Sequence, residues 1–198
     1  MSDTIIFIDN FDSFSYNLVD ELTVLGNEVL VYRNDVDPKI ISDTAKLQKS
    51  KGNNVVLVLS PGPSRPEDAN NLLPIIRQNL GVYPMLGICL GHQALGLALG
   101  GRVTGAPQIV HGKSSMMRHN MTLCFEGLPN PLKIARYHSL IVDNLPSNVQ
   151  VLSTYEEMCM CLYEPQYQVL GFQFHPESVM TTFGRKLLAN ALTLIAQE

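Results

Sequence analysis

The sequence predicts an α/β fold with an open, mostly parallel sheet, helices on both faces and a small antiparallel extension. Short apolar runs alternate with helical patterns over the first half of the 198-residue chain, the order typical of βαβ units. These runs show no polar alternation, as is typical of strands buried on both faces. After residue 101 short β-like runs replace the alternation. No linker separates the two parts, so we expect residues 1–198 to form a single domain.

The first half supplies the strands and helices of the parallel part. Apolar runs predict strands at residues 4–9, 28–32, 55–59 and 85–88. The first helix is expected to begin after a cap at Asp12 or Ser13 and to end at Gly26. Its apolar stripe consists of Phe14, Leu18, Leu22 and Leu25. Further helices are expected at residues 38–49, 68–80 and 90–99, the last apolar on nearly all sides, as a central helix would be.

The second half supplies the antiparallel part and a closing helix. Short β-like runs lie at residues 109–110, 133–136, 149–155, 158–163 and 169–174. The last helix is amphipathic, with one apolar face made of Phe183, Leu187, Leu188, Ala191, Leu192 and Ile195.

Composition excludes several classes of protein. With 45% hydrophobic residues and a formal net charge of −4, the chain is neither disordered nor basic enough to bind nucleic acid. No apolar run reaches the ~18 residues of a membrane helix, and the N-terminus has no secretory signal, so we expect a cytoplasmic protein. The charged fraction of 16% is below the usual ~25%, which is consistent with a surface partly covered by another chain.

The cysteines do not form a metal or disulfide pattern. Cys89, Cys124, Cys159 and Cys161 include no CxxC pair, and in a reducing compartment they should be free thiols. Cys159 and Cys161 alternate along one predicted strand, where buried and inert thiols are the simpler interpretation. We therefore expect no metal site in this chain.

One cysteine lies in a nucleophile-elbow pattern. Gly87-Ile88-Cys89-Leu90-Gly91 joins a buried strand to a helix, the layout of the G-x-S-x-G elbow with cysteine in place of serine. The sharp turn strains the backbone of the central residue, and the glycines remove side chains that would collide there. The helix N-terminus favours a thiolate. The alternative is a small buried packing cysteine, which the strand before it and the helix after it disfavour.

A histidine and a glutamate can complete a triad with this cysteine. His175 and Glu177 follow the strand at 169–174, and alternate residues of an extended chain project to the same side. Glu177 can therefore hold one imidazole nitrogen while the other faces the thiol. Without the cysteine elbow, the two residues would be read as a surface histidine and a solvated glutamate at the end of a strand. His92, His111, His119 and His138 have no metal-ligand spacing, and we assign His92 no catalytic part.

A proline-rich turn is expected to face the elbow. Ser60-Pro61-Gly62-Pro63-Ser64 follows a central strand, and ligands of open α/β sheets bind at the carboxyl ends of strands. The amides of Gly62 and Leu90 could then form a two-donor oxyanion hole, each donor contributing roughly 3 kcal/mol in the transition state.

Taken together, these motifs resemble those of the class I (triad-type) glutamine amidotransferases along nearly the whole chain. The matching segments, in order, are residues 9–14, 61–63, 87–93, 111–113, 136–140 and 171–178. The likeness is greatest to the small subunits of anthranilate synthase, component II. The chain departs from the pattern at Ser64, where many members have glycine, which puts the fine geometry of that loop in question.

The resemblance implies a flavodoxin-like sheet and a defined chemistry. Cys89 would attack the side-chain amide of L-glutamine, His175 would transfer the proton to ammonia, and Glu177 would orient His175. The glutamine and oxyanion site would be formed by Gly62, Pro63, Ser64, Leu90, Gln93, Ser139 and Leu140. No cofactor is implied for this chain, and a magnesium ion only for its partner.

The resemblance also implies a protein partner and leaves alternatives open. The large component I of anthranilate synthase would use the ammonia to convert chorismate to anthranilate for tryptophan synthesis, docking near residues 9–14 and 111–113. The nearest rival is the corresponding subunit of aminodeoxychorismate synthase in folate synthesis, or one subunit shared by both. A stand-alone γ-glutamyl thiol hydrolase and a non-catalytic scaffold are further alternatives. The phrases Gly171-Phe172-Gln173-Phe174 and Thr181-Thr182-x-Gly184 favour the anthranilate type.

Overall fold

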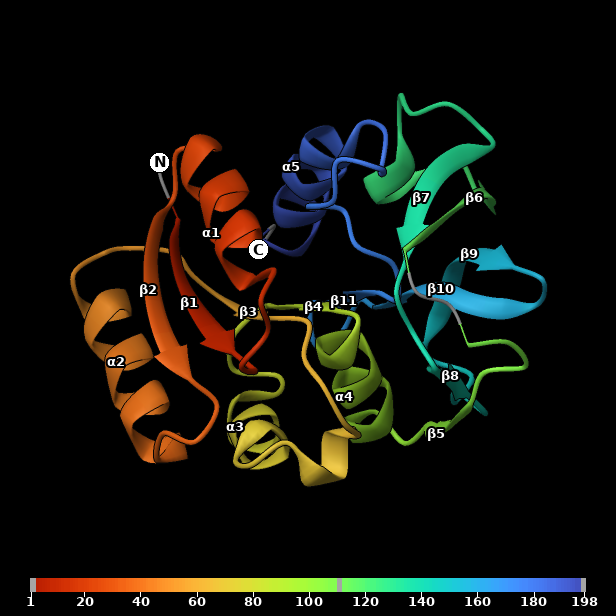
Figure 1. The fold of residues 1–198 in the computed structure, drawn as a ribbon. Helices are drawn as coiled ribbons and strands as arrows, with labels where there is room; N and C mark the ends of the chain where they lie inside the picture. Colours follow the sequence, from red (N-terminus) through yellow and green to blue (C-terminus); the bar gives the residue numbers. More distant parts are fainter. Residues whose placement is uncertain (1–2, 110–111, 197–198) are drawn as a thin grey trace.

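The computed structural model describes residues 3–109 and 112–196. Within them, one sheet has the strand order β2-β1-β3-β4-β11-β10-β9-β6-β7 (Figure 1). The parallel part and its helices are β1 (Thr4–Asp9), α1 (Ser15–Val24), β2 (Glu28–Arg33), α2 (Pro38–Ser50), β3 (Val55–Leu59), a 3-10 turn η1 (Pro66–Asp68), α3 (Leu72–Asn79), β4 (Met85–Ile88), α4 (Leu90–Ala98) and β11 (Val169–Phe172). The remaining elements are β5 (Arg102–Gly105), β6 (Lys113–His119), η2 (Leu123–Phe125), β7 (Leu132–Arg136), β8 (Leu140–Asp143), β9 (Gln150–Tyr155), β10 (Met158–Glu164) and α5 (Gly184–Ile195).

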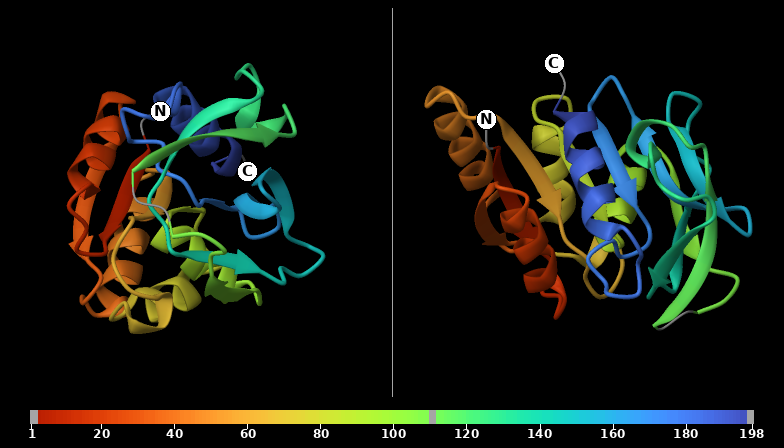
Figure 2. Two further views of the ribbon diagram at one scale, coloured as in Figure 1. Left: turned by 45° about the vertical axis from the view of Figure 1, so that its right-hand side comes forward. Right: turned by 90° about the horizontal axis from the view of Figure 1, so that it is seen from above.

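The parallel strands separate two apolar layers. Ile5 and Phe7 of β1 pack with α1 and α5, whereas Ile6 and Ile8 pack with α2, α3 and α4. Figure 2 shows these two groups of helices on opposite faces of the sheet. Both sets of side chains are fully buried, which explains the uninterrupted apolar runs in the sequence. The predicted α/β class, with helices on both faces of a mostly parallel sheet, is confirmed.

The antiparallel extension begins where β10 pairs with β11. From there β9, β6 and β7 each pair antiparallel with their neighbour, and β5 pairs with β8 in a separate two-stranded ribbon. Most of this half had been predicted as short strands. The ribbon of β5 and β8 was not, because each strand has only four residues and a half-exposed pattern.

Some predicted boundaries are wrong for identifiable reasons. The helix expected at 68–80 begins later, because residues 66–68 form η1 and Asn70 adopts a left-handed φ of 48° before α3. The strand expected at 109–110 is replaced by β6 further along the chain. Ile109 is exposed and outside any strand, and Val110 lies outside the described residues.

Two aromatic residues assigned to buried helix faces are exposed at helix N-termini instead. Phe14 is the N-cap of α1 and 41% exposed, and Phe183 is the N-cap of α5 and 56% exposed. Neither Asp12 nor Ser13 caps α1, and Asp12 instead accepts a hydrogen bond from the Phe14 amide at 2.8 Å. The expected helix end at Gly26 is confirmed by its left-handed φ of 91°.

The parallel order places the functional loops together. Strands β1, β3, β4 and β11 run in the same direction, so the segments that follow them meet at one edge of the sheet. Among the described helices, none is long and apolar enough to cross a membrane.

One contact in the central layer can be tested directly. Gly171 of β11 lies against α4, and a Cβ at this position would lie 2.8 Å from Nδ1 of His92. We expect Gly171→Ala to lower the free energy of unfolding by about 1–3 kcal/mol in urea denaturation, because the added methyl group would overpack the buried layer between β11 and α4. Gly105→Ala is the matched control, since its Cβ would meet nothing within 4 Å. Equal stabilities of the two variants would contradict this account of the packing.

Candidate functional site

The cysteine elbow has the strained geometry that its sequence predicts. Cys89 joins β4 to α4 with φ 51° and ψ −100°, a conformation that only close packing sustains. Gly87 and Gly91 make it possible: a Cβ on Gly87 would lie 2.5 Å from the Gly91 carbonyl carbon, and one on Gly91 would lie 2.3 Å from the Leu59 oxygen. The Cys89 amide donates to the Phe172 oxygen at 2.8 Å, which ties the elbow to β11.

His175 and Glu177 form a buried pair beside the elbow. Nδ1 of His175 lies 2.7 Å from Oε1 of Glu177, and both side chains are almost fully buried. Nε2 of His175 has no hydrogen-bond partner among the described residues. Tyr137 packs edge-on against the imidazole, with ring centroids 5.1 Å apart. The ring is therefore fixed by one nitrogen and one face, and its second nitrogen is available.

The electrostatics of the pair favour a charged imidazole. Burial would lower the pKa of His175, but the Glu177 carboxylate and the neighbouring Cys89 side chain raise this pKa well above its ordinary 6.5. This arrangement suits a protonated imidazole held by a carboxylate, which can give its proton to a leaving group.

A threonine fixes the backbone of this segment. The Thr181 hydroxyl donates to the His175 carbonyl at 2.6 Å and accepts from the Ala135 amide at 2.9 Å. The His175 amide donates to the Ala135 oxygen at 3.1 Å. Gly184 packs so closely that a Cβ would lie 1.9 Å from the Pro176 oxygen. The segment 175–177 is thus clamped between β7 and the start of α5, and sequence analysis assigned Thr181 no such role.

The proline-rich turn lies against the elbow, as predicted from the order of the strands. A Cβ on Gly62 would lie 2.7 Å from Cδ2 of Leu90 and 2.6 Å from Cβ of Asn10. The Ser60 hydroxyl accepts from the Asn10 amide at 2.8 Å, and the Asn10 side chain donates to the Ser60 oxygen at 2.8 Å. Gly62 and Leu90 are therefore neighbours, and buried hydrogen bonds hold the turn in place.

Ser64, where many class I glutamine amidotransferases have glycine, adopts a backbone conformation that favours glycine. Its φ is 70°, in the left-handed region where glycine is favoured. A serine there bears strain that a glycine would not, so the loop keeps its path at an energetic cost.

A cavity of about 180 Å³ opens beside the sulfur. Its lining includes most of the residues expected to bind the substrate, together with two that sequence reasoning did not assign to the site: Gly62, Pro63, Ser64, Cys89, Gln93, Ser139, Leu140, Tyr137 and His138. Leu90 is buried and does not line the cavity. Tyr137 and His138 belong to residues 136–140, one of the segments that resemble the amidotransferase family. This segment, rather than either residue alone, was the sequence feature that could have assigned them to the site.

The Leu140 carbonyl organises one wall of the cavity. It accepts hydrogen bonds from Nε2 of Gln93 and Nδ1 of His138, both at 3.1 Å. Burial lowers the pKa of His138 to about 4, so this ring is neutral and carries its proton on Nδ1. Gln93 uses its second N–H on Oε1 of Gln173 at 3.2 Å, which leaves the Gln93 oxygen for a ligand.

The other histidines and cysteines stand apart from the chemistry. His92 is fully buried against β11, where burial lowers its pKa to about 3, and His119 is bonded to Pro129 and stacked on Phe125. His111 lies outside the described residues. Burial raises the pKa of Cys159 to about 12 and that of Cys161 well above the usual value, as expected for inert thiols.

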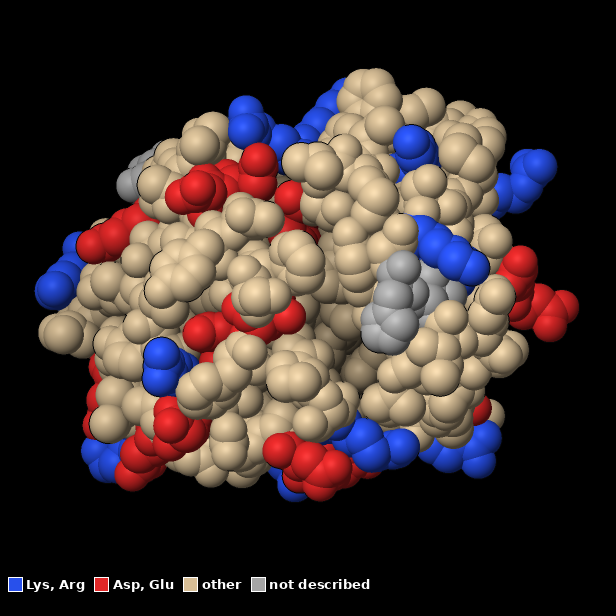
Figure 3. Space-filling model, viewed as in Figure 1, with Lys and Arg blue, Asp and Glu red and all other residues tan. Residues whose placement is uncertain are grey.

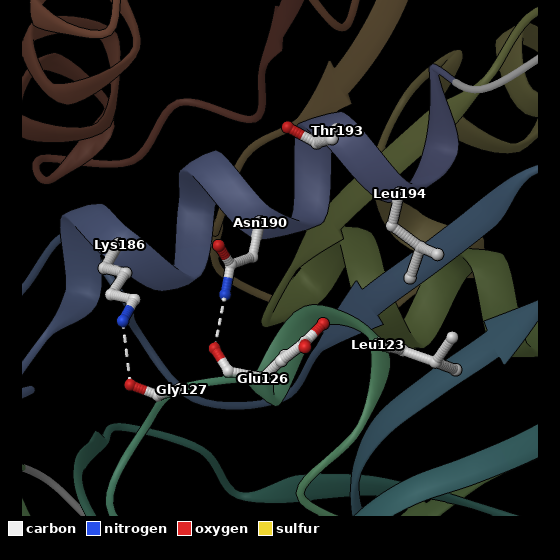
Figure 4. Close-up of a pocket in the computed structure, with 7 residues that line it drawn as sticks. All are labelled: Leu123, Glu126, Gly127, Lys186, Asn190, Thr193 and Leu194. Atoms are coloured by element: carbon white, nitrogen blue, oxygen red, sulfur yellow. Dashed lines mark hydrogen bonds between the residues drawn. The ribbon is translucent and has the colours of Figure 1, made fainter.

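A larger hollow lies elsewhere and lacks reactive groups. The cavity between η2 and α5 has a volume of about 530 Å³. Figure 4 shows Lys186 and Asn190 donating to the carbonyls of Gly127 and Glu126, so its polar groups serve to fasten η2 to the helix. The small cavity at Cys89 instead has a strained cysteine in its lining and lies next to the buried His175–Glu177 pair and the Gly62 turn, an arrangement suited to acyl transfer through a thioester.

Comparisons with known proteins agree with this arrangement. The family described as "Glutamine amidotransferase class-I" matches residues 6–195. Anthranilate synthase component 2 of Vibrio parahaemolyticus is 46% identical over 95% of this chain and 94% of its own. The pyocyanine-specific component 2 of Pseudomonas aeruginosa is 45% identical over 95% and 92%. A solved structure from Thermoplasma acidophilum, described as that of a GMP synthase subunit, has the same fold, with a TM-score of 0.83 at 24% identity over 99% and 95% of the chains.

The Glu177 carboxylate is expected to make stability depend on pH. Because the folded-state pKa of His175 lies above 6.5, its charged form stabilises the protein fully below pH 6.5, and this contribution is lost as the pH rises through the folded value. Glu177→Gln removes the charge while retaining an oxygen acceptor. We expect it to lower the free energy of unfolding by about 1–3 kcal/mol at pH 6 and by less at pH 9.5, in urea titrations. The same difference at both pH values would argue against a charged His175.

Proposed function

We propose, from the premise that this chain belongs to the class I glutamine amidotransferase family, that it is the glutamine-hydrolysing subunit of an anthranilate synthase. The observation that carries this proposal is the cavity at Cys89, which adjoins the buried His175–Glu177 pair and the Gly62 turn. Relatives named as component 2 cover nearly the whole chain, which supports the anthranilate assignment over the folate one.

The cavity suits an amino acid with a side-chain amide. A volume of about 180 Å³ holds one small molecule rather than a peptide. In the proposed complex, the Gln93 side-chain oxygen accepts from the α-ammonium group of L-glutamine. Backbone groups of Ser139 and Leu140 complete the recognition. The side-chain amide of the substrate then reaches the Cys89 sulfur between the Gly62 and Leu90 amides.

The proposed reaction proceeds in two stages. The Cys89 thiolate attacks the amide carbon of glutamine, and the Gly62 and Leu90 amides stabilise the oxyanion. Protonated His175 donates its Nε2 proton to the departing nitrogen, so that the C–N bond breaks, ammonia leaves and a γ-glutamyl thioester remains. Neutral His175 then takes a proton from water, whose oxygen attacks the thioester carbon. Glutamate leaves and the thiolate is restored, while Glu177 orients the imidazole throughout.

No cofactor is proposed for this chain. The thiol, the imidazole and the amide donors supply the nucleophile, the proton transfer and the charge stabilisation that amide hydrolysis needs. The proposed magnesium ion belongs with the chorismate-converting partner. We assign the anthranilate to tryptophan synthesis, although a relative named pyocyanine specific is comparably similar to this chain.

Cys89→Ser tests the nucleophile and the proposed function together. We expect this variant, mixed with the large component of anthranilate synthase, to lose glutamine-dependent anthranilate formation by at least about 10³-fold. Added ammonium salts should still support anthranilate formation, because the partner's chemistry is intact. The measurement is anthranilate fluorescence, with the large component of aminodeoxychorismate synthase tested in parallel. Full glutamine use by the variant, or activity only with the folate partner, would overturn the assignment.

An apolar rim beside the triad is the proposed docking face for the partner. It consists of exposed Phe11, Phe14, Val179 and Phe183. Phe14 lies 6.4 Å from the His175 ring between centroids, and Val179 is two residues beyond Glu177. Exposed apolar clusters of this kind are typical of protein interfaces. Uncharged residues also make up most of the face in Figure 3, in keeping with the low charged fraction of the chain. In the described part of the 111–113 segment, Gly112 lies beside Tyr137, whose ring packs on those of Phe14 and His175.

Val179→Asp tests the docking face without disturbing the core. Val179 is fully exposed, so the change should leave the fold intact. We expect it to weaken association with the large component roughly tenfold or more, because a charge would be buried at the interface. Val82→Asp is the matched control, since Val82 is 62% exposed and precedes β4 at the opposite edge of the sheet. Sedimentation of the mixed proteins measures both, and equal affinities would place the interface elsewhere.

A further inference from the structure

A buried glutamine contacts the reacting sulfur from behind the cavity. Gln173 follows β11 and is fully buried. Its amide N–H donates to the Met160 oxygen at 2.9 Å, which holds its backbone at the edge of β10. Its side-chain Nε2 lies 3.8 Å from Sγ of Cys89, within hydrogen-bond reach of a sulfur atom. Gln173 does not line the cavity, so its contact with the sulfur leaves the approach of a substrate open.

The orientation of this amide is fixed by a chain of hydrogen bonds. The Leu140 carbonyl can only accept, so the Gln93 group facing it must be the NH2 group, at 3.1 Å. The second N–H of the same group donates to Oε1 of Gln173 at 3.2 Å. Gln173 must then present its own NH2 group to Cys89. A flipped Gln173 amide would set two donors against each other and an oxygen against the sulfur.

A donor fixed in this way acts on the ionisation of the thiol. A hydrogen bond to a charged acceptor is roughly twice as strong as one to a neutral acceptor, so an N–H aimed at sulfur favours the thiolate. In the proposed mechanism His175 is the other group that acts on this sulfur, through Nε2, which has no hydrogen-bond partner within the described residues. The thiolate would therefore have two donors, one that exchanges a proton during the reaction and one that cannot.

We propose that Gln173 is a further catalytic residue, whose side-chain amide, locked by Gln93 and the Leu140 carbonyl, stabilises the thiolate of Cys89. The inference rests on the proposed function in so far as Cys89 is the nucleophile. It assigns to Gln173 an action on the sulfur itself rather than on the bound substrate. Its sign is definite, because removal of the donor must make the sulfur less reactive at neutral pH.

The test is the pH dependence of Cys89 alkylation in the full chain. Gln173→Met preserves length and removes the donor, and Gln173→Glu preserves shape but brings a carboxyl group to the sulfur. Iodoacetamide labelling at Cys89 is followed by peptide mass spectrometry, which separates it from the buried Cys124, Cys159 and Cys161. Gln150→Met, at an exposed position of β9, is the matched control.

We expect Gln173→Met to slow labelling at pH 7 roughly tenfold and to move the midpoint of the pH profile upward by about one unit. Gln173→Glu should move this midpoint at least as far, and it keeps the test open if the methionine variant does not fold. The control should match the wild type. Unchanged profiles in a folded Gln173 variant, even with reduced glutamine hydrolysis, would overturn the inference and leave Gln173 a packing residue.

The outcome is separable from that of the proposed function. Labelling reports on the sulfur without a partner, glutamine or chorismate. Shifted profiles in the Gln173 variants, together with a wild-type protein that fails to support anthranilate formation, would support the role of Gln173 and contradict the anthranilate assignment. Normal anthranilate formation by the wild type, with unshifted profiles in the Gln173 variants, would support the anthranilate assignment and contradict the role of Gln173.

Discussion

The site depends on the positive φ of Cys89 at the junction of β4 and α4. A non-glycine residue with φ 51° and ψ −100° is unfavourable by roughly 1–3 kcal/mol and persists only where its surroundings fix it. Here Gly87 and Gly91 allow backbone segments to approach closely on both sides, and the bond from Cys89 to Phe172 joins the elbow to β11. The same strand leads directly to His175. The fold that holds the nucleophile under strain therefore also delivers its base.

Three buried histidines in and around the site differ in charge because their surroundings differ. Burial acts on all of them in the same direction, and it lowers the pKa of His92 to about 3 and of His138 to about 4. Only His175 has a carboxylate at hydrogen-bond distance, and its pKa is raised well above 6.5. One imidazole is thus prepared to hold and release a proton, while the others remain neutral. What distinguishes the proposed base from the structural histidines is therefore a carboxylate partner rather than depth of burial.

Sequence reasoning succeeded where the information is local. The strands at 55–59 and 85–88 were predicted to the residue, because a strand buried on both faces is a continuous apolar run. The elbow and the His175–Glu177 pair were also predicted from the sequence, because the spacing of their residues along the chain determines how they lie in space. The ribbon of β5 and β8, the clamp by Thr181 and the wall formed by Tyr137 and His138 were missed. These features depend on contacts between distant segments, and four half-exposed residues or a lone threonine carry no periodic signal for them.

Substrate recognition and nucleophile ionisation share one hydrogen-bond network. The Leu140 carbonyl, which lines the cavity, sets the orientation of Gln93, and Gln93 sets that of the residue behind the sulfur. A change at Gln93 would therefore alter both the wall that meets the ligand and the donor that meets Cys89. Groups that share a buried network are non-additive when substituted in pairs. On the proposed roles, a substitution of Gln93 is therefore expected to change glutamine binding and the reactivity of the Cys89 thiol together.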